Sequence, residues 1–223
     1  MAIPVSRAAI IPAAGFGTRL NKGPKGFLKL ADRTLIEWVA HTLEPIVDIV
    51  VIAVPEGYQA IAAGLLPNCL IITGGNSRHH TINKLFDSCN AQTILLQDAA
   101  RPFASQALCE EVLTAAEKHK AAGAFVDPVV PIGKINNNHV THFWHHSEVG
   151  IFQAPQAFSY SVLAQALQQP KAESFQSTAQ LVMSAGQSLY AVRGEAENIK
   201  ITSPLDWDIA EKVIAPKLGY LPA

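Results

Sequence analysis

The segment Ile10-Ile11-Pro12-Ala13-Ala14-Gly15-Phe16-Gly17-Thr18-Arg19-Leu20, followed by Pro24-Lys25, has the residue types that hold a phosphate chain. An apolar run gives way here to small residues and two glycines, so backbone N–H groups can approach an anion closely. Arg19 and Lys25 add two cations that can neutralise the anion. The alternative is a simple glycine turn with both cations in solvent.

The two common glycine-loop motifs are absent from this segment. A dinucleotide fingerprint requires a third glycine where Leu20 stands, and no Gly-Lys-Ser/Thr sequence of a P-loop follows. The loop therefore disfavours an oxidoreductase that uses a dinucleotide.

Asp98 is the candidate metal ligand. It ends an apolar run at residues 93–97, and open α/β sheets bind ligands at the carboxyl ends of their strands. A carboxylate beside phosphates is repelled unless a hard cation such as Mg²⁺ lies between them. The alternative is that Asp98 caps the following turn and pairs with Arg101.

Composition predicts one cytoplasmic domain spanning residues 1–223. Hydrophobic residues make up 49%, charged residues 16%, and the formal net charge is -1. Such a balance provides no global field for nucleic acid or an anionic membrane. No apolar run reaches the roughly 20 residues of a membrane span. The three cysteines are widely spaced, as expected of reduced thiols in the cytoplasm.

Short β-branched runs alternate with helical patterns along the first half of the chain. Strands are expected at residues 8–11, 49–54, 70–73 and 93–97, and helices at 34–43, 58–65, 80–89 and 106–120. This alternation predicts an α/β fold with a Rossmann-like, mostly parallel sheet covered by helices on both faces. Further helices are expected at 160–167 and 176–185, a strand at 189–192, and a last helix from an N-cap at Ser203 to about residue 215.

Residues 129–153 break this pattern and predict a protruding β-arm. Two strands, 128–135 and 139–144, flank an asparagine turn, and such a ribbon is too polar for a core of its own. It is expected to pack on a second subunit, which makes a homodimer. Four histidines in the arm, His139, His142, His145 and His146, favour polar surface residues over a metal site, because no cysteine or acid pair completes a ligand set.

Four blocks together resemble one enzyme family. The first loop is similar to that of sugar- and polyol-phosphate nucleotidyltransferases. Three further blocks resemble 2-C-methyl-D-erythritol 4-phosphate cytidylyltransferases of isoprenoid synthesis, in the same order over nearly the whole chain. These are Gly74-Gly75-Asn76-Ser77-Arg78-His79-His80-Thr81-Ile82, Asp98-Ala99-Ala100-Arg101-Pro102 and Ala196-Glu197-Asn198-Ile199-Lys200-Ile201-Thr202.

The resemblance implies an enzyme that transfers CMP from CTP to a polyol phosphate and releases pyrophosphate, with Mg²⁺ held at Asp98. It assigns catalysis to Arg19, Lys25 and Lys200, although Lys200 alone would pass for a surface lysine. It assigns nucleotide binding to a larger set: Pro12, Ala13, Ala14, Gly15, Phe16, Gly17, Gly75, Asn76, Arg78, Thr81, Ala99 and Arg101.

The acceptor half departs from the family pattern. Ile132 and Ala154 stand where the family has threonines, and His146 stands where it has an arginine. Two hydroxyls and one permanent charge are thereby lost, and imidazole binds phosphate less firmly than guanidinium. The best single candidate for the acceptor is 2-C-methyl-D-erythritol 4-phosphate. Another acceptor such as ribitol 5-phosphate, or a nucleotide-binding homologue without catalysis, remains open.

Overall fold

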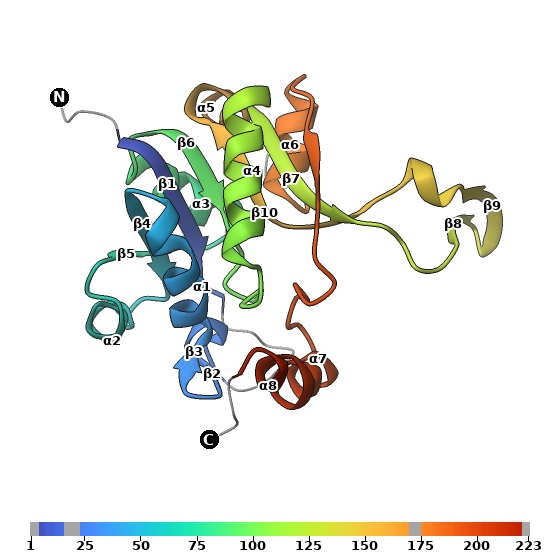
Figure 1. Cartoon of the computed structure of the whole chain (residues 1–223). Coiled ribbons are helices and arrows are strands. Elements are labelled where there is room, and N and C mark those ends of the chain that lie inside the picture. The colour runs from blue at the N-terminus through green and yellow to red at the C-terminus, as the bar shows by residue number, and fades with distance from the viewer. Residues whose placement is uncertain (1–4, 16–22, 170–174, 220–223) are drawn as a thin grey trace.

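A seven-stranded sheet forms the centre of the molecule (Figure 1). The computed structural model describes residues 5–15, 23–169 and 175–219. The strand order is β11-β7-β10-β6-β1-β4-β5, and every neighbouring pair is parallel except those made by β10. The strands are β1 (Val5–Pro12), β4 (Ile49–Val54), β5 (Leu70–Thr73), β6 (Ala91–Leu96), β7 (Ala121–Val126), β10 (Ile151–Ser159) and β11 (Tyr190–Arg193). The expectation of a mostly parallel sheet is confirmed.

Helices cover both faces of this sheet, as the alternating pattern predicts. One hydrophobic cluster joins one sheet face to α1 (Leu35–Leu43), α2 (Gln59–Leu65) and α4 (Gln106–His119). A second joins the opposite face to α3 (Arg78–Asp87), α5 (Tyr160–Leu167) and α6 (Thr178–Ser184). Burial on both faces explains why the strands read as continuous apolar runs.

Two central strands, β7 and β10, have no counterpart among the predicted elements. The first half of β7 consists of alanine and glycine, which have low strand propensity. β10 contains Pro155, which cannot donate a ladder hydrogen bond and normally argues against a central strand. The structure accommodates this proline where the register of β10 against β7 shifts, between Gln153 and Gln156.

The C-terminal helices form a third cluster against the start of the chain. α7 (Pro204–Ile209), a π-helical turn (Ala210–Ile214) and α8 (Ala215–Lys217) pack through Trp207 on Leu30 and Trp38. The first quarter of the chain contains a small hairpin of two strands, β2 (Lys29–Leu30) and β3 (Arg33–Thr34). It also contains two 3-10 turns, η1 (Lys25–Phe27) and η2 (Glu44–Ile46). Ile201 is fully buried in this cluster, which anchors the segment that carries Lys200.

The expected helix start at Ser203 is confirmed as a capping box. Ser203 Oγ accepts from the N–H of Asp206 at 3.2 Å, and Asp206 Oδ2 accepts from the N–H of Ser203 at 2.7 Å. Asp206 also accepts from the hydroxyl of Thr202, and these bonds lower its pKa to about 2. The cap thereby fixes the end of the loop that follows β11.

The arm projects away from the sheet (Figure 1). It consists of β8 (Ile132–Asn136), β9 (His139–Trp144) and the 3-10 turn η3 (His146–Glu148). Asn137 and Asn138 have φ of 47° and 64°, the geometry of a tight hairpin turn. The expected bounds were too wide: residues 128–131 form no strand, and residues 151–153 belong to β10 in the central sheet.

The sequence also raised the state of the cysteines, possible metal-ligand groups and membrane-spanning helices. All three cysteines are free, and burial, as the largest cause, raises the pKa of each thiol to about 12. Within the described ranges, no group of three or more His, Cys, Asp or Glu side chains could hold a metal ion. None of the helices in those ranges has the length and apolar character needed to cross a bilayer.

Replacing Ser203 by alanine is expected to lower the free energy of unfolding by about 1 kcal/mol, because the N–H of Asp206 loses its acceptor. Urea denaturation followed by circular dichroism measures this change. The control is Ser188→Ala, at an exposed serine outside any helix, which should change stability by less than about 0.5 kcal/mol. Equal effects of the two substitutions would contradict the capping role.

Candidate active site

A cavity of about 270 Å³ lies at the carboxyl ends of β1 and β6. The two strands are adjacent and parallel, with Ile10 opposite Leu96, so the loops that follow them emerge side by side. Chemistry-bearing residues from four separate segments meet here. The lining consists of Pro12, Ala13, Gly15, Lys25, Gly26, Arg78, Asp98, Ala99, Ala100 and Lys200.

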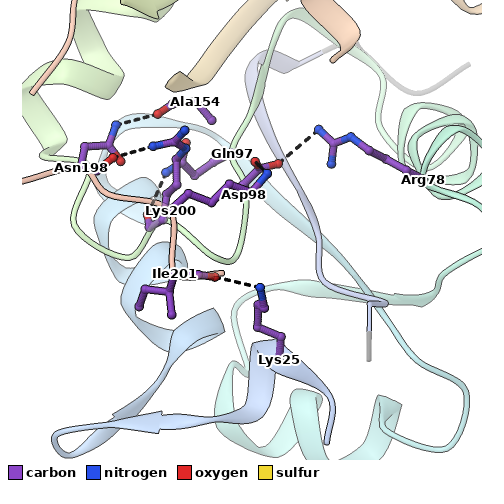
Figure 2. Close-up of polar contacts among 9 residues, drawn as sticks. Lys25, Arg78, Gln97, Asp98, Ala154, Asn198, Lys200 and Ile201 are labelled. Carbon is purple, nitrogen blue, oxygen red and sulfur yellow. Dashed lines mark hydrogen bonds and ion pairs between the residues drawn. The ribbon is translucent and has the colours of Figure 1, made fainter. Parts of the chain in front are cut away.

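Asp98 lies between two cations at this cavity (Figure 2). Lys200 Nζ is 2.8 Å from Oδ2 and Arg78 Nη2 is 3.2 Å from Oδ1, while only 13% of the Asp98 side chain is exposed. Burial alone would raise the pKa of this carboxyl; the charges of Arg78 and Lys200 outweigh burial and lower it from 3.8 to about 2. Asp98 is therefore ionised at neutral pH and holds both cations at the cavity.

Lys25 links the glycine-rich loop to the C-terminal segment. Its Nζ donates to the carbonyl of Ile201 at 2.8 Å (Figure 2). Its N–H donates to the carbonyl of Gly15 at 3.2 Å. The cavity is thus lined by Lys25 from the N-terminal part of the chain and by Lys200 from the C-terminal part. Both ammonium groups could reach a bound anion.

A second cavity, of about 740 Å³, shares Pro12, Gly15 and Arg78 with the first. Its other lining residues come mainly from the ends of β4 and β5: Ala14, Pro55, Glu56, Thr73, Gly74, Gly75, Asn76, Ser77 and Thr81. A Cβ at position 74 would overlap the Cβ of Ala14, so only glycine permits this close approach of two loops. Two adjoining cavities with shared walls suit an elongated ligand.

Thr81 holds the loop at the wall of the second cavity through its hydroxyl group. Its hydroxyl donates to the carbonyl of Ser77 at 2.9 Å and accepts from the N–H of Gly75 at 3.0 Å. Lys84 adds a bond of 3.2 Å to the carbonyl of Gly74. These bonds hold the Gly74–Ser77 loop, whose residue Asn76 lines the cavity.

Arg101 does not line either of these cavities. Its guanidinium is largely buried and donates through Nη1 to the carbonyl of Asn198 at 2.6 Å. Burial lowers the pKa of this guanidinium, and the negative charge of Asp98 opposes that effect. A direct contact between Arg101 and a nucleotide stays a prediction; the structure gives the side chain a partner in the protein instead.

The three acceptor candidates are separated. Ile132 begins β8, and His146 lies in the exposed turn η3, so both belong to the projecting arm. Ala154 is buried in β10, where its carbonyl accepts from Asn198 Nδ2 at 2.7 Å. Within one chain, these positions do not converge on the first cavity, which Asp98 lines.

Phe16, Gly17 and Arg19 lie outside the described residues, so their assigned roles remain predictions.

Sequence reasoning missed the polar residues that support Lys200. Gln153 and Asn198 are buried and bonded to each other, with Asn198 Nδ2 3.2 Å from Gln153 Oε1. Glu195 joins them through bonds of its main chain to the side chain of Gln153. The available signal was a pair of amides, Gln153 and Gln156, in an otherwise apolar stretch, and an asparagine two residues before the lysine to which the resemblance assigns catalysis.

The arrangement is suited to binding a polyanion. Three cations, Lys25, Arg78 and Lys200, line the first cavity together with one carboxylate, Asp98, which leaves an excess of positive charge there. A single carboxylate also fits Mg²⁺, which commonly takes one or two protein carboxylates and completes its shell with water and substrate phosphates. Asp98 would hold this ion once phosphate groups share its cationic partners.

Replacing Arg78 by alanine is expected to raise the pKa of Asp98, because Arg78 provides the largest charge effect that lowers it. In the native chain, pairing of Asp98 stabilises the fold above its ordinary pKa of 3.8, and this contribution is lost as the pH falls toward 2. Carbon-13 NMR titration of the carboxyl groups measures the shift. Asp206 is the internal control, since its low pKa arises from Thr202 and Ser203; an unmoved Asp98 would contradict the role of Arg78.

Comparison with known proteins agrees with this site. The family model for 2-C-methyl-D-erythritol 4-phosphate cytidylyltransferase matches residues 7–215. The enzyme of that name from Deinococcus radiodurans is 33% identical over 206 residues, which cover 92% of this chain and 88% of the relative. The Thermus thermophilus enzyme is also 33% identical, over 92% of this chain and 95% of its own.

Solved structures of this family have the same fold. The crystal structure of 2-C-methyl-D-erythritol 4-phosphate cytidylyltransferase from Thermus thermophilus superposes with a TM-score of 0.78 at 28% identity, covering 95% of this chain and 99% of the other. A structure from Anaerococcus prevotii, at 23% identity, agrees in fold with a TM-score of 0.82 over 93% and 97% of the two chains. The chain belongs to the 2-C-methyl-D-erythritol 4-phosphate cytidylyltransferase family, a family of CTP-dependent nucleotidyltransferases.

Proposed function

We propose that this chain transfers CMP from CTP to 2-C-methyl-D-erythritol 4-phosphate and releases pyrophosphate, a step of isoprenoid precursor synthesis. The observation that carries the proposal is a cavity lined by Lys25 and by Asp98 with its two cationic partners, Arg78 and Lys200, which adjoins a second cavity. The second cavity, of about 740 Å³, has room for a nucleoside beside the triphosphate.

The reaction requires the protein mainly to position and neutralise anions. An oxygen of the acceptor phosphate attacks the α-phosphorus of CTP; a new P–O bond forms, and the bond to the bridging oxygen of the β-phosphate breaks. Pyrophosphate leaves with that oxygen and its electron pair. Because two anions must approach each other, cations fixed in the cavity lower the barrier, and no protein nucleophile is needed.

Each cation has a distinct place in this step. Lys25 lies beside the glycine-rich loop and would neutralise the triphosphate, whereas Lys200 would reach the α-phosphate from the C-terminal segment. Arg78 lines both cavities and would contact the nucleotide between its phosphates and ribose. Asn76 and the backbone of Gly75 offer donors and acceptors to the edge of the cytosine ring.

Asp98 is the residue that would hold Mg²⁺. When bound, the ion would supply a Lewis acid that withdraws negative charge from the phosphate oxygens. The carboxylate is ionised at neutral pH, as a ligand must be, because its pKa is about 2. The same charge keeps Lys200 at the cavity in the absence of a nucleotide, with a separation of 2.8 Å.

Pyrophosphate release from Mg²⁺ and CTP with a panel of acceptors tests this function. Release with 2-C-methyl-D-erythritol 4-phosphate is expected. Release only with ribitol 5-phosphate or another polyol phosphate would assign a different acceptor, consistent with Ile132, His146 and Ala154. Calorimetric binding of CTP without turnover on any acceptor would make the chain a nucleotide-binding homologue.

The proposed location of the reaction is the cytoplasm, which the three free thiols support.

Lys200→Ala is expected to lower kcat by about 100-fold or more, because a charge that stabilises the transition state is removed. Steady-state pyrophosphate assays measure the change. The matched control is Lys212→Ala, an exposed lysine of the C-terminal π-helical turn that pairs with Asp208 and should leave kcat unchanged. Near-normal turnover of the Lys200 variant would mean that this lysine lies outside the chemistry.

The exposed apolar side chains of the arm are the observation that favours a homodimer. Six large apolar side chains on or beside it are exposed: Val129, Val130, Ile135, Val140, Phe143 and Trp144. An isolated two-stranded hairpin is marginally stable in water, and an apolar surface of this kind normally meets a partner. A second copy would cover it and would receive Ile132 and His146 near its own cavity.

Phe143→Asp is expected to weaken the dimer at least about 30-fold, as loss of a buried aromatic anchor does. Sedimentation velocity over a concentration series measures dissociation. Met183→Asp, at an exposed apolar residue outside the arm, is the control and should leave association unchanged. A wild-type protein that stays monomeric at all concentrations would refute the dimer.

A further inference from the structure

We infer that Asn198, together with Gln153, is a positioning residue that fixes the ammonium group of Lys200 at the cavity. Neither side chain lines the cavity in which the reaction is proposed to occur. The inference rests on the proposed function, since it concerns how Lys200 performs its part in nucleotidyl transfer.

Asn198 is bonded on both its side chain and its main chain. Its Nδ2 donates to the carbonyl of Ala154 at 2.7 Å and to Oε1 of Gln153 at 3.2 Å, and the residue has no exposed surface. Its main-chain carbonyl accepts from Arg101 at 2.6 Å. The backbone two residues before Lys200 is thus attached to a central strand of the sheet.

Gln153 attaches the same loop at a second point. Its Nε2 donates to the carbonyl of Glu195 at 3.0 Å, and its Oε1 accepts from the N–H of Glu195 at 3.3 Å. The Glu195 carboxylate in turn accepts from the N–H of Ser105, the N-cap of α4, at 3.0 Å and from its hydroxyl. The loop between β11 and α7 is therefore held to β10 and to α4.

Arg101 connects this loop to the turn that carries Asp98. Asp98 and Arg101 belong to one turn, closed by a bond from the N–H of Arg101 to the carbonyl of Asp98 at 3.0 Å. The guanidinium of Arg101 holds Asn198, and Gln97 Nε2 donates to the carbonyl of Arg101 at 3.0 Å. The segments that carry the two partners of the Lys200–Asp98 ion pair are consequently also joined through the side chain of Arg101.

The network carries a cost that stability alone does not explain. Among the described residues, Gln97 Oε1, Arg101 Nε and Asn198 Oδ1 are buried without a hydrogen-bond partner. Each such atom normally destabilises a fold, and an apolar core would avoid that cost. A lysine has a flexible four-carbon stem, so its backbone must be held rigidly if the ammonium group is to meet a developing charge. Misplacement by about 1 Å can cost about 100-fold in rate.

A double-mutant cycle between Asn198 and Lys200 tests the inference. Asn198→Ala in the otherwise native chain is expected to lower kcat by roughly 10- to 100-fold, with the KM for CTP changed less than about threefold. In a Lys200→Ala background, the same substitution should lower kcat less than about threefold, because the group that it positions is already gone. Gln153→Met should give the same pattern, and circular dichroism confirms that each variant is folded.

The outcomes separate this inference from the proposed function. Full additivity of the two substitutions, or a change confined to the KM for CTP, would overturn the positioning role while leaving the enzyme's activity in place. Failure of both the Asn198 and Gln153 variants to fold would also overturn it, by making the network purely structural. Absence of pyrophosphate release by the native chain would instead overturn the function. Thr93→Val, at a buried threonine of β6 that lines neither cavity, is the control and should keep native turnover.

Discussion

The paired carboxylate of Asp98 is the interaction on which the site depends. Lys200 and Arg78 come from segments far apart in the chain, and their like charges repel each other. Asp98 holds Lys200 at 2.8 Å and Arg78 at 3.2 Å, so that the cavity is formed before any anion enters. Such pre-organisation removes a cost that would otherwise fall on substrate binding.

The strand order explains how these residues reach one place. β1 lies between β6 and β4, and all three run parallel, so the glycine-rich loop and the Asp98 turn leave the same edge of the sheet. β5 adds the loop from Gly74 to Ser77 at that edge. The C-terminal segment also lies at this edge, where the carbonyl of Ile201 accepts a hydrogen bond from Lys25. The side chain of Ile201 is buried in the hydrophobic cluster that contains Trp207.

Sequence patterns predicted the secondary-structure elements that depend on neighbouring residues. Strands β4 and β5 and helix α5 have their predicted bounds, because short β-branched runs and apolar periodicity arise from neighbouring residues. The same patterns missed β10, whose proline is tolerated only because the register shifts beside it. They also missed the bonds of Gln153 to Asn198 and Glu195, whose positions are distant along the chain. No periodicity encodes which distant partner a buried amide will meet.

The residues proposed to bind the nucleotide and those proposed to bind the acceptor are under different physical constraints. Lys25, Arg78, Asp98 and Lys200 line one cavity of a single chain. Each has a protein partner there, so a change in any of them would disturb its neighbours. Ile132 and His146 stand on a projecting arm, where few contacts of their own chain constrain them. Their contribution to an acceptor pocket would require a second subunit to cover the arm. Under the proposed function, substitutions there would alter the choice of acceptor while the charged cavity proposed for nucleotidyl transfer stays unchanged.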